Sequence, residues 1–478
     1  MFAATEHDTN LQTTIYKIKI QKRKRKHIMA KKKPLIGVIS LGCDKNRVDT
    51  ENMLTLLKRA GYNFTADSAS ADIIIINTCA FIANARKESM ETILEMSQFK
   101  KIGTCKKLIV TGCMPQKYLH EMQAELPEVD AFLGINEYEN IVEIVDNLMN
   151  TKQQFVKLDG PEKLLTVSDR MITTPTHYAY LMIADGCNNF CAYCTIPYIR
   201  GRYRSRTIEE LVAQATELVQ GGSQEIILVA QDVTRYGTDL YGEPKLVQLI
   251  QELSKIEDLR WIRLLYCYPE LVDDALLNEI VTNDKVCKYI DIPFQHVSTS
   301  VLKRMNRHIT YQEIVALVEK IQALPKHIAI RTTFMVGFPG ETNEDFNLLL
   351  RFVKKYKLRN VGFFAYSREE GTVAGKMPEQ IPETIKQKRL VKLVKAQKRN
   401  VLQTNRKLIG KELDVVYEGI DYEQELFFGR TQRQAPEIDT LVYFSSKTPV
   451  DIGEMYKIKI KKVKDYDIKG EKIDEFAE

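Results

Sequence analysis

Short apolar runs alternate with helix-length segments along most of this 478-residue chain, and this alternation restricts its fold more than any other feature. Continuous apolar runs predict buried parallel strands, which are joined by right-handed helical crossovers. The first such runs are 35–41, 73–76 and 108–110, and the helical stretches after them are 46–60, 83–98 and 115–126. With a last helix at 137–148, residues 34–150 are predicted to form a parallel α/β domain.

Each of these three apolar runs leads into a cysteine, namely Cys43, Cys79 or Cys113. The carboxyl ends of parallel strands form the binding edge of such a sheet, so thiols more than thirty residues apart in sequence can meet there. A single cysteine in this position is commonly just a small buried residue. Repetition after three strands favours a shared metal centre instead.

A second set of three cysteines, Cys187, Cys191 and Cys194, has C-x₃-C-x₂-C spacing on a loop after the apolar run 178–183. A structural zinc site usually has four ligands, and no fourth cysteine lies nearby in the sequence. An iron–sulfur cluster held by three cysteines leaves one iron open to another ligand. The spacing therefore favours a cluster over a zinc knuckle or three ordinary thiols. Cys105, Cys267 and Cys287 lack such placement and are predicted to be structural.

The second domain is predicted at residues 177–404, after a weakly patterned linker at 151–176. Its six strand-like runs are too few to close an eight-stranded barrel, which predicts an open partial (β/α)6 barrel with its site at the strand carboxyl ends. The loop with Gly337, Gly340 and Glu341 is either a place where backbone approaches a nucleoside or an ordinary turn.

Other polar residues of this domain leave alternatives open. His296 is more often a satisfied polar residue than a ligand. Four arginines after the cysteine loop either line an anionic cofactor or substrate, or form a solvated edge: Arg200, Arg202, Arg204 and Arg206.

Residues 405–474 read as several short strands, which predicts a small β-barrel of the OB-like kind. This segment holds thirteen Lys or Arg and fourteen Asp or Glu, a net charge of −1. An RNA-binding barrel is expected to carry a basic face, so this balance counts against RNA as a partner of the barrel.

The remaining features concern location. Residues 1–28 contain seven Lys or Arg against two acidic residues, so residues 1–33 are predicted to be a basic, disordered extension. The sequence has no apolar run long enough to span a membrane. Nine cysteines without a secretory signal favour a reducing, cytoplasmic location.

From Pro34 onward the chain resembles the methylthiotransferases of the radical S-adenosylmethionine (radical SAM) superfamily, on the strength of both cysteine sets and the aromatic Tyr193 before the last cysteine. The resemblance implies an N-terminal methylthiotransferase domain, a radical SAM domain and a C-terminal TRAM domain. The RimO branch, which modifies ribosomal protein uS12, is indicated by softer segments: Ser40-Leu41-Gly42-Cys43-Asp44-Lys45-Asn46, Arg263-Leu264-Leu265-Tyr266 with Tyr268-Pro269-Glu270, Gly429-Arg430 and Ala435-Pro436-Glu437-Ile438-Asp439.

The resemblance also implies the chemistry. Cys187, Cys191 and Cys194 would hold a 4Fe-4S cluster whose open iron chelates the methionyl amine and carboxylate of S-adenosylmethionine. Cys43, Cys79 and Cys113 would hold an auxiliary 4Fe-4S cluster that carries the sulfur to be transferred. S-adenosylmethionine would act as radical source and methyl donor, and the target would be the β-carbon of an aspartate in uS12.

A partner that supplies electrons, such as flavodoxin or ferredoxin, is implied as well. Two alternatives remain: methylthiolation of adenosine in tRNA, and an iron–sulfur redox or RNA-binding protein without group transfer.

Overall fold

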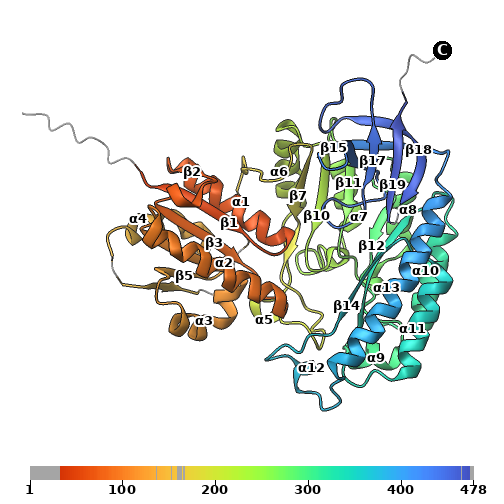
Figure 1. The fold of residues 1–478 in the computed structure, drawn as a ribbon, viewed down its shortest axis with the longest axis horizontal. Coiled ribbons are helices and arrows are strands. Elements are labelled where there is room, and N and C mark those ends of the chain that lie inside the picture. The colour runs from red at the N-terminus through yellow and green to blue at the C-terminus, as the bar shows by residue number, and fades with distance from the viewer. Residues whose placement is uncertain are drawn as a thin grey trace, which may run out of the picture. The chain divides into compact units, whose positions relative to one another are not determined.

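The N-terminal part of the chain forms a six-stranded parallel sheet in the computed structural model, which describes residues 33–135, 137–151, 153–158, 164, 167–464 and 466–473. The predicted extension at 1–33 lies outside these residues apart from Lys33. The sheet order is β2-β1-β3-β4-β5-β6 (Figure 1). The strands are β1 (Leu35–Ser40), β2 (Asn63–Thr65), β3 (Ile73–Thr78), β4 (Lys107–Gly112), β5 (Ala131–Leu133) and β6 (Phe155–Lys157).

The helices of this domain are α1 (Asp44–Arg59), α2 (Ala83–Ile102), α3 (Cys113–Glu125) and α4 (Ile141–Leu148). β3 is buried at all six positions, as its run of four isoleucines predicts. β6 pairs with β5 inside the segment assigned to a linker, so the sheet extends past the predicted boundary at residue 150. This strand, FVK, has only three residues, which is too short for a periodic signal in the sequence.

The predicted partial barrel is confirmed. Six parallel strands form two three-stranded sheets, and an isolated parallel bridge between Ile262 and Val286 joins them. The strands are β7 (Tyr178–Met182), β10 (Glu225–Val229), β11 (Trp261–Leu264), β12 (Tyr289–Asp291), β13 (Ala329–Val336) and β14 (Asn360–Ala365). The longer helices between them are α6 (Ile208–Gln220), α7 (Leu246–Ser254), α8 (Asp274–Thr282), α10 (Tyr311–Gln322) and α11 (Asn343–Tyr356).

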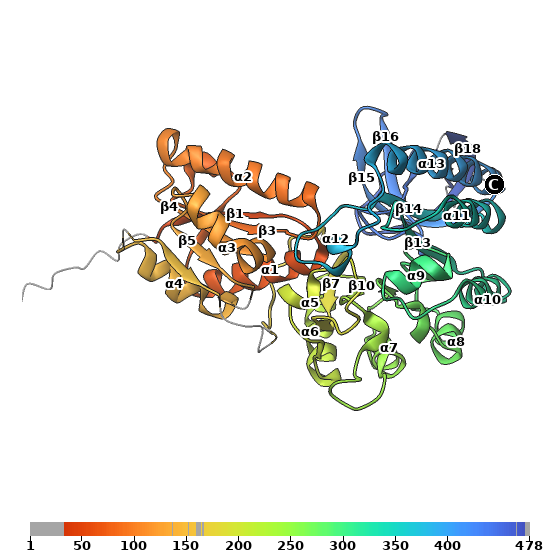
Figure 2. The same ribbon diagram turned by 90° about the horizontal axis from the view of Figure 1, so that it is seen from below.

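Shorter elements complete this domain: β8 (Ala184–Asp185), β9 (Arg204–Ser205), α5 (Ile196–Ile199), α9 (Thr299–Arg304) and α12 (Val373–Lys376). α1 contacts β7 and α3 contacts α5, so the carboxyl edge of the N-terminal sheet meets the start of the barrel (Figure 2). No helix in the described ranges is long and apolar enough to cross a membrane.

The predicted C-terminal barrel is also confirmed, after a long helix α13 (Glu383–Arg406). Five strands close in the order β15-β16-β17-β19-β18. They are β15 (Glu412–Asp421), β16 (Leu426–Arg430), β17 (Val442–Ser445), β18 (Met455–Lys464) and β19 (Asp467–Lys472). β19 gives no strand signal in the sequence because its residues, DIKGEK, are mostly charged and include a glycine. Pairing with both β17 and β18 makes it a strand.

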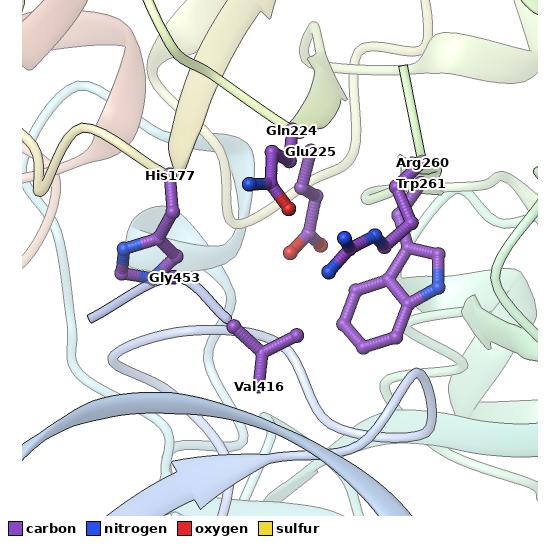
Figure 3. Close-up of a pocket in the computed structure, with 7 residues that line it drawn as sticks. All are labelled: His177, Gln224, Glu225, Arg260, Trp261, Val416 and Gly453. Carbon is purple, nitrogen blue, oxygen red and sulfur yellow. The ribbon is translucent and has the colours of Figure 1, made fainter. Parts of the chain in front are cut away.

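A buried ionic network fastens this barrel to the partial barrel. Glu225 at the start of β10 pairs with Arg263 on β11 and with Arg430 on β16, at 2.5 Å in both cases. Arg430 also reaches Glu418 at 2.7 Å, and His177 Nε2 lies 2.9 Å from the same carboxylate. The adjoining cavity, shown in Figure 3, has a volume of about 10 Å³, barely enough for one water molecule.

Replacing Glu225 by glutamine should lower the unfolding free energy by about 2–3 kcal/mol, because two buried guanidinium groups lose their shared partner.

Burial alone would raise the pKa of Glu225, but Arg263 and Arg430 outweigh it and hold the pKa below the ordinary value of 4.5. A depressed folded pKa stabilises the protein above the unfolded pKa, and this contribution is lost as pH falls below about 4.5. Thermal unfolding between pH 7 and 4 should therefore show a smaller acid-dependent loss in Glu225→Gln than in the wild type. An unchanged pH slope would contradict this assignment.

Candidate active site

Cys43, Cys79 and Cys113 lie at the carboxyl ends of β1, β3 and β4, which are adjacent strands of the sheet. Cys43 is the N-cap residue of α1 and Cys113 is the first residue of α3. Cys79 and Cys113 are buried, and burial raises the pKa of Cys79 and raises that of Cys113 to about 12. Buried thiols of this kind need a strong positive centre, such as iron, to become thiolates.

Two glycines with positive φ allow these loops to approach each other. A Cβ at Gly42 (φ +91°) would lie 2.6 Å from Cβ and 3.0 Å from Sγ of Cys79. A Cβ at Gly112 (φ +98°) would lie 2.2 Å from Asn77 Oδ1. A side chain at either position would push the cysteine loops apart.

Asn46 holds the three loops together. Its Nδ2 donates to Leu41 O at 3.1 Å and to Thr78 O at 3.0 Å, while Cys113 Sγ lies 3.6 Å from its Oδ1. Each of these partners belongs to a different cysteine loop. The sequence analysis gave Asn46 no role, although its place three residues after Cys43 puts it on the first turn of the same helix.

The second cysteine set occupies the loop between β8 and α5. Backbone N–H groups of Asn189 and Ile196 donate to Cys187 Sγ and Cys194 Sγ, both at 3.4 Å. Tyr268 Oη lies 3.2 Å from Cys191 Sγ. Burial raises the pKa of Cys187 to about 11 and also raises that of Cys194.

Gly186 shapes the start of this loop. Its φ is +80°, and a Cβ there would lie 2.1 Å from Arg202 O. The loop is closed at this point by Cys187 N, which donates to Gly201 O at 3.1 Å. Only glycine allows the two backbone segments to come this close.

Arg200 connects the two cysteine sets. It follows α5 in the partial-barrel domain, and its Nη1 contacts both carboxylate oxygens of Asp185 at 3.2 Å. Its Nη2 reaches Asn46 Oδ1 at 2.7 Å, Asp49 Oδ2 at 2.8 Å and Cys113 Sγ at 3.9 Å. One guanidinium therefore joins the loop that precedes Cys187 to the helix that follows Cys43.

The two carboxylates around Arg200 respond differently to burial. Burial raises the pKa of Asp49 to about 6 despite Arg200. Burial also tends to raise the pKa of Asp185. Arg200, Gln231 and Arg204 outweigh burial and keep this pKa below its ordinary value. Asp185 meets the guanidinium through both of its carboxylate oxygens, and Asp49 meets it through one.

Glu369 forms a second connection between the domains. The Glu369 carboxylate accepts a hydrogen bond from Ala83 N, which lies 3.2 Å away at the start of α2. It also forms an ion pair with Arg86. Ser367 also donates to it at 2.8 Å. The segment after β14 is therefore held against the helix that follows Cys79.

The described residues contain no group of three or more His, Cys, Asp or Glu side chains that could hold a single metal ion. A zinc site needs such a group within about 2.3 Å of one ion, whereas a four-iron cluster offers each thiolate its own iron. Several buried polar atoms near the cysteines or at barrel strand ends have no hydrogen-bond partner in the described part of the chain: Asp44 Oδ2, Asn77 Oδ1, Thr111 Oγ1, Thr195 Oγ1, Gln231 Oε1 and Gln295 Oε1. Such atoms are normally satisfied, so this region fits a large polar group.

The loop predicted to approach a nucleoside turns toward neighbouring helices. A Cβ at Gly337 (φ +74°) would meet Lys386 Cγ at 2.3 Å, and one at Gly340 (φ +76°) would meet Arg304 Nη1 at 1.3 Å. Glu341 is buried, accepts from Gly337 N within its own loop and pairs with Arg389 at 3.3 Å. These contacts give the loop a structural role, and its contact with S-adenosylmethionine stays a prediction.

The other candidates separate by burial. His296 is buried and its Nδ1 accepts from Ser298 N at 2.9 Å, whereas its Nε2 has no hydrogen-bond partner among the described residues and lies 3.9 Å from Glu341 Oε1. Arg200 and Arg206 are buried, so a solvated edge is wrong for both, while Arg202 is exposed. Arg206 donates to Met182 O and Gln214 Oε1, a structural arrangement.

Comparison with known proteins gives three family matches along the chain. They are an uncharacterized protein family, UPF0004, at residues 36–134, the radical SAM superfamily at 181–353 and the TRAM domain at 409–473. Among solved structures, the radical SAM methyltransferase TsrM from Kitasatospora setae, with cobalamin and a [4Fe-4S] cluster bound, has a TM-score of 0.55 at 13% identity. That match covers 72% of this chain and 77% of TsrM, and shows a shared fold.

Sequence relatives are much closer. The ribosomal protein uS12 methylthiotransferase RimO of Desulforamulus reducens is 46% identical over 92% of this chain and 99% of its own length. RimO of Geobacter sulfurreducens is also 46% identical, over 93% and 99%. The chain therefore belongs to the RimO family of ribosomal protein uS12 methylthiotransferases.

Proposed function

We propose that this chain methylthiolates ribosomal protein uS12 at the β-carbon of an aspartate, with two 4Fe-4S clusters and with S-adenosylmethionine as radical source and methyl donor. The observation that carries the proposal is the link through Arg200 between cysteine sets on two domains. Such a link is expected where two cofactors must act on one substrate carbon. An iron–sulfur redox protein without group transfer would need no S-adenosylmethionine.

In this proposal residues 34–150 supply Cys43, Cys79 and Cys113 for the auxiliary cluster. Residues 177–404 supply Cys187, Cys191 and Cys194 for the cluster that binds S-adenosylmethionine, and residues 405–474 are the TRAM domain. When bound, the cofactors supply a radical and a sulfur atom, which side chains cannot provide for an unactivated C–H bond.

The chain's own residues position and enclose this chemistry. Asn189, Ile196 and Tyr268 place N–H or O–H groups beside the sulfurs of the second set, which stabilises anionic sulfur. Arg200 and Glu369 each fasten the two domains together, and in this proposal that closure would help to keep water and stray hydrogen donors from the reaction. An electron donor such as flavodoxin or ferredoxin and a cytoplasmic location belong to the same proposal.

The charge on the C-terminal barrel favours the protein substrate over tRNA. Two lysines of β18 are already paired, Lys457 with Asp414 at 3.2 Å and Lys461 with Glu471 at 2.9 Å. Paired lysines release fewer counterions on binding phosphates than an unpaired basic stripe does. The balanced surface suits a basic partner such as uS12 better.

The test is to incubate the anaerobically reconstituted protein with S-adenosylmethionine, sulfide and reductant, together with small ribosomal subunits or bulk tRNA. We expect uS12 to gain the mass of one methylthio group in place of a hydrogen, as measured by mass spectrometry. Samples without S-adenosylmethionine are the control. Modified tRNA with unmodified uS12 would favour the tRNA alternative, and no 5′-deoxyadenosine despite intact clusters would favour the redox alternative.

A further inference from the structure

Asp44 and Lys45 form a buried ion pair where the first cysteine loop meets the barrel. Lys45 Nζ lies 3.0 Å from Asp44 Oδ1, 3.4 Å from Ala230 O and 3.8 Å from the centroid of the Tyr266 ring. The side chains of Lys45 and Asp44 are only 9% and 7% exposed. Ala230 follows β10 and Tyr266 follows β11, so the ammonium from the cysteine loop reaches the carboxyl ends of the barrel strands.

The pair has unused hydrogen-bonding capacity on both sides. Asp44 Oδ1 also lies within reach of Lys45 N (3.1 Å) and Tyr266 Oη (3.4 Å), whereas the buried Asp44 Oδ2 has no partner in the described ranges. An ammonium has three donors, and the described residues place two oxygen acceptors near this one. A ligand with one anionic group and one N–H donor would satisfy both residues.

The neighbouring cation cannot take this role. Arg200 already binds Asp185, Asp49 and Asn46, so its fork is occupied by the protein. The family resemblance assigns the amine and carboxylate of S-adenosylmethionine to iron, so the cofactor does not need the pair. An aspartate residue within a peptide has the required chemistry, a side-chain carboxylate and a backbone N–H.

We propose, on the basis of the function proposed above, that Lys45 binds the carboxylate of the target aspartate and that Asp44 Oδ2 accepts its backbone N–H. The β-carbon is bonded directly to the carboxylate carbon, so fixing the carboxylate also fixes the carbon to be modified. An adenine ring offers Lys45 no negative charge. Lys45 is thus a specificity-determining residue for a protein substrate.

The experiment compares two peptides from the uS12 target loop, one with the target aspartate and one with asparagine in its place. Binding to the reconstituted full chain is measured anaerobically by fluorescence anisotropy. We expect the wild type to prefer the aspartate peptide by about tenfold to a hundredfold, the range of a charge-assisted hydrogen bond. Lys45→Met should bind both peptides alike, and Asp44→Asn should weaken both by a similar factor. Lys58→Met, at the exposed end of the same helix, should match the wild type.

The outcomes separate this inference from the function on which it rests. A wild type that neither binds nor modifies the aspartate peptide overturns both. A wild type that modifies it, with the preference intact in Lys45→Met, overturns only the role of Lys45. Loss of peptide-independent 5′-deoxyadenosine formation in Lys45→Met would assign the residue to the cofactor and also overturn the inference.

The iron content of each Lys45 variant is measured as a control for folding. Should Lys45→Met lose iron, Lys45→Gln retains a donor toward Ala230 O and takes its place. Loss of iron in both variants would make Lys45 a support of the cysteine loop and overturn the proposal.

Discussion

Cys113→Ala should abolish methylthio transfer to uS12 while S-adenosylmethionine is still cleaved to 5′-deoxyadenosine, and Cys191→Ala should abolish both. The reason is that the two cysteine sets lie on different domains and each domain has its own core. In the proposed function, loss of one thiolate from the auxiliary set would remove the sulfur carrier, and loss of one from the second set would remove the site of cofactor cleavage. Iron content, chromatography of 5′-deoxyadenosine and mass spectrometry of uS12 measure the three quantities in one sample.

Cys105 provides a matched control for these variants. It is buried in the same domain as Cys113, and its Sγ contacts Lys107 O at 3.4 Å rather than a cysteine loop. Cys105→Ala should keep the iron content and both activities of the wild type. A full complement of iron in Cys113→Ala, or a loss of iron in Cys105→Ala, would contradict the assignment of the auxiliary set.

Arg200→Met should lower the unfolding free energy by about 3–5 kcal/mol, because Asp49 and Asp185 are left buried without their shared cation. Without the guanidinium, the pKa of Asp49, already about 6, rises further above its unfolded value. A raised carboxyl pKa makes ionisation costly in the folded state, so the variant should lose more stability as pH rises from 5 to 8. Anaerobic thermal unfolding across this pH range measures the effect.

Arg202→Met is the matched control, since Arg202 is exposed two residues away on the same segment. Its unfolding free energy should stay within about 0.5 kcal/mol of the wild type. Arg200→Lys should recover part of the stability but not the contact between domains, because one ammonium lacks the planar fork that spans two carboxylates. Equal stability of the Arg200 and Arg202 methionine variants would show that the bridge contributes nothing.

Local pattern predicted most of the architecture. The isoleucine run of β3, the cysteine that follows each of β1, β3 and β4, and the C-x₃-C-x₂-C loop are contiguous signals, and the strands formed where those signals lie. β6 and β19 were missed because their side chains carry little periodicity and their strand character comes from pairing partners distant in sequence.

The contacts that join the two domains at the candidate site could not be predicted from the sequence. Arg200 is one of four similar arginines, and only the docking of two domains selects it as the one that meets Asp49, 151 positions away. Lys45 and Ala230 are 185 positions apart, so no spacing rule relates them. The same holds for Glu369, whose partners lie at the start of α2.

The network of His177, Glu225, Arg263, Glu418 and Arg430 has a consequence for engineering this family. These charges come from both domains: Glu225 pairs with Arg430 and His177 contacts Glu418 across the seam, while Glu225–Arg263 and Glu418–Arg430 pair within one domain. A TRAM module grafted from a tRNA-modifying relative would leave unmatched ions in a dry junction unless its counterparts on the host were exchanged as well. A TRAM domain exchanged between relatives therefore has to be transferred together with the charged residues of the partial barrel that contact it.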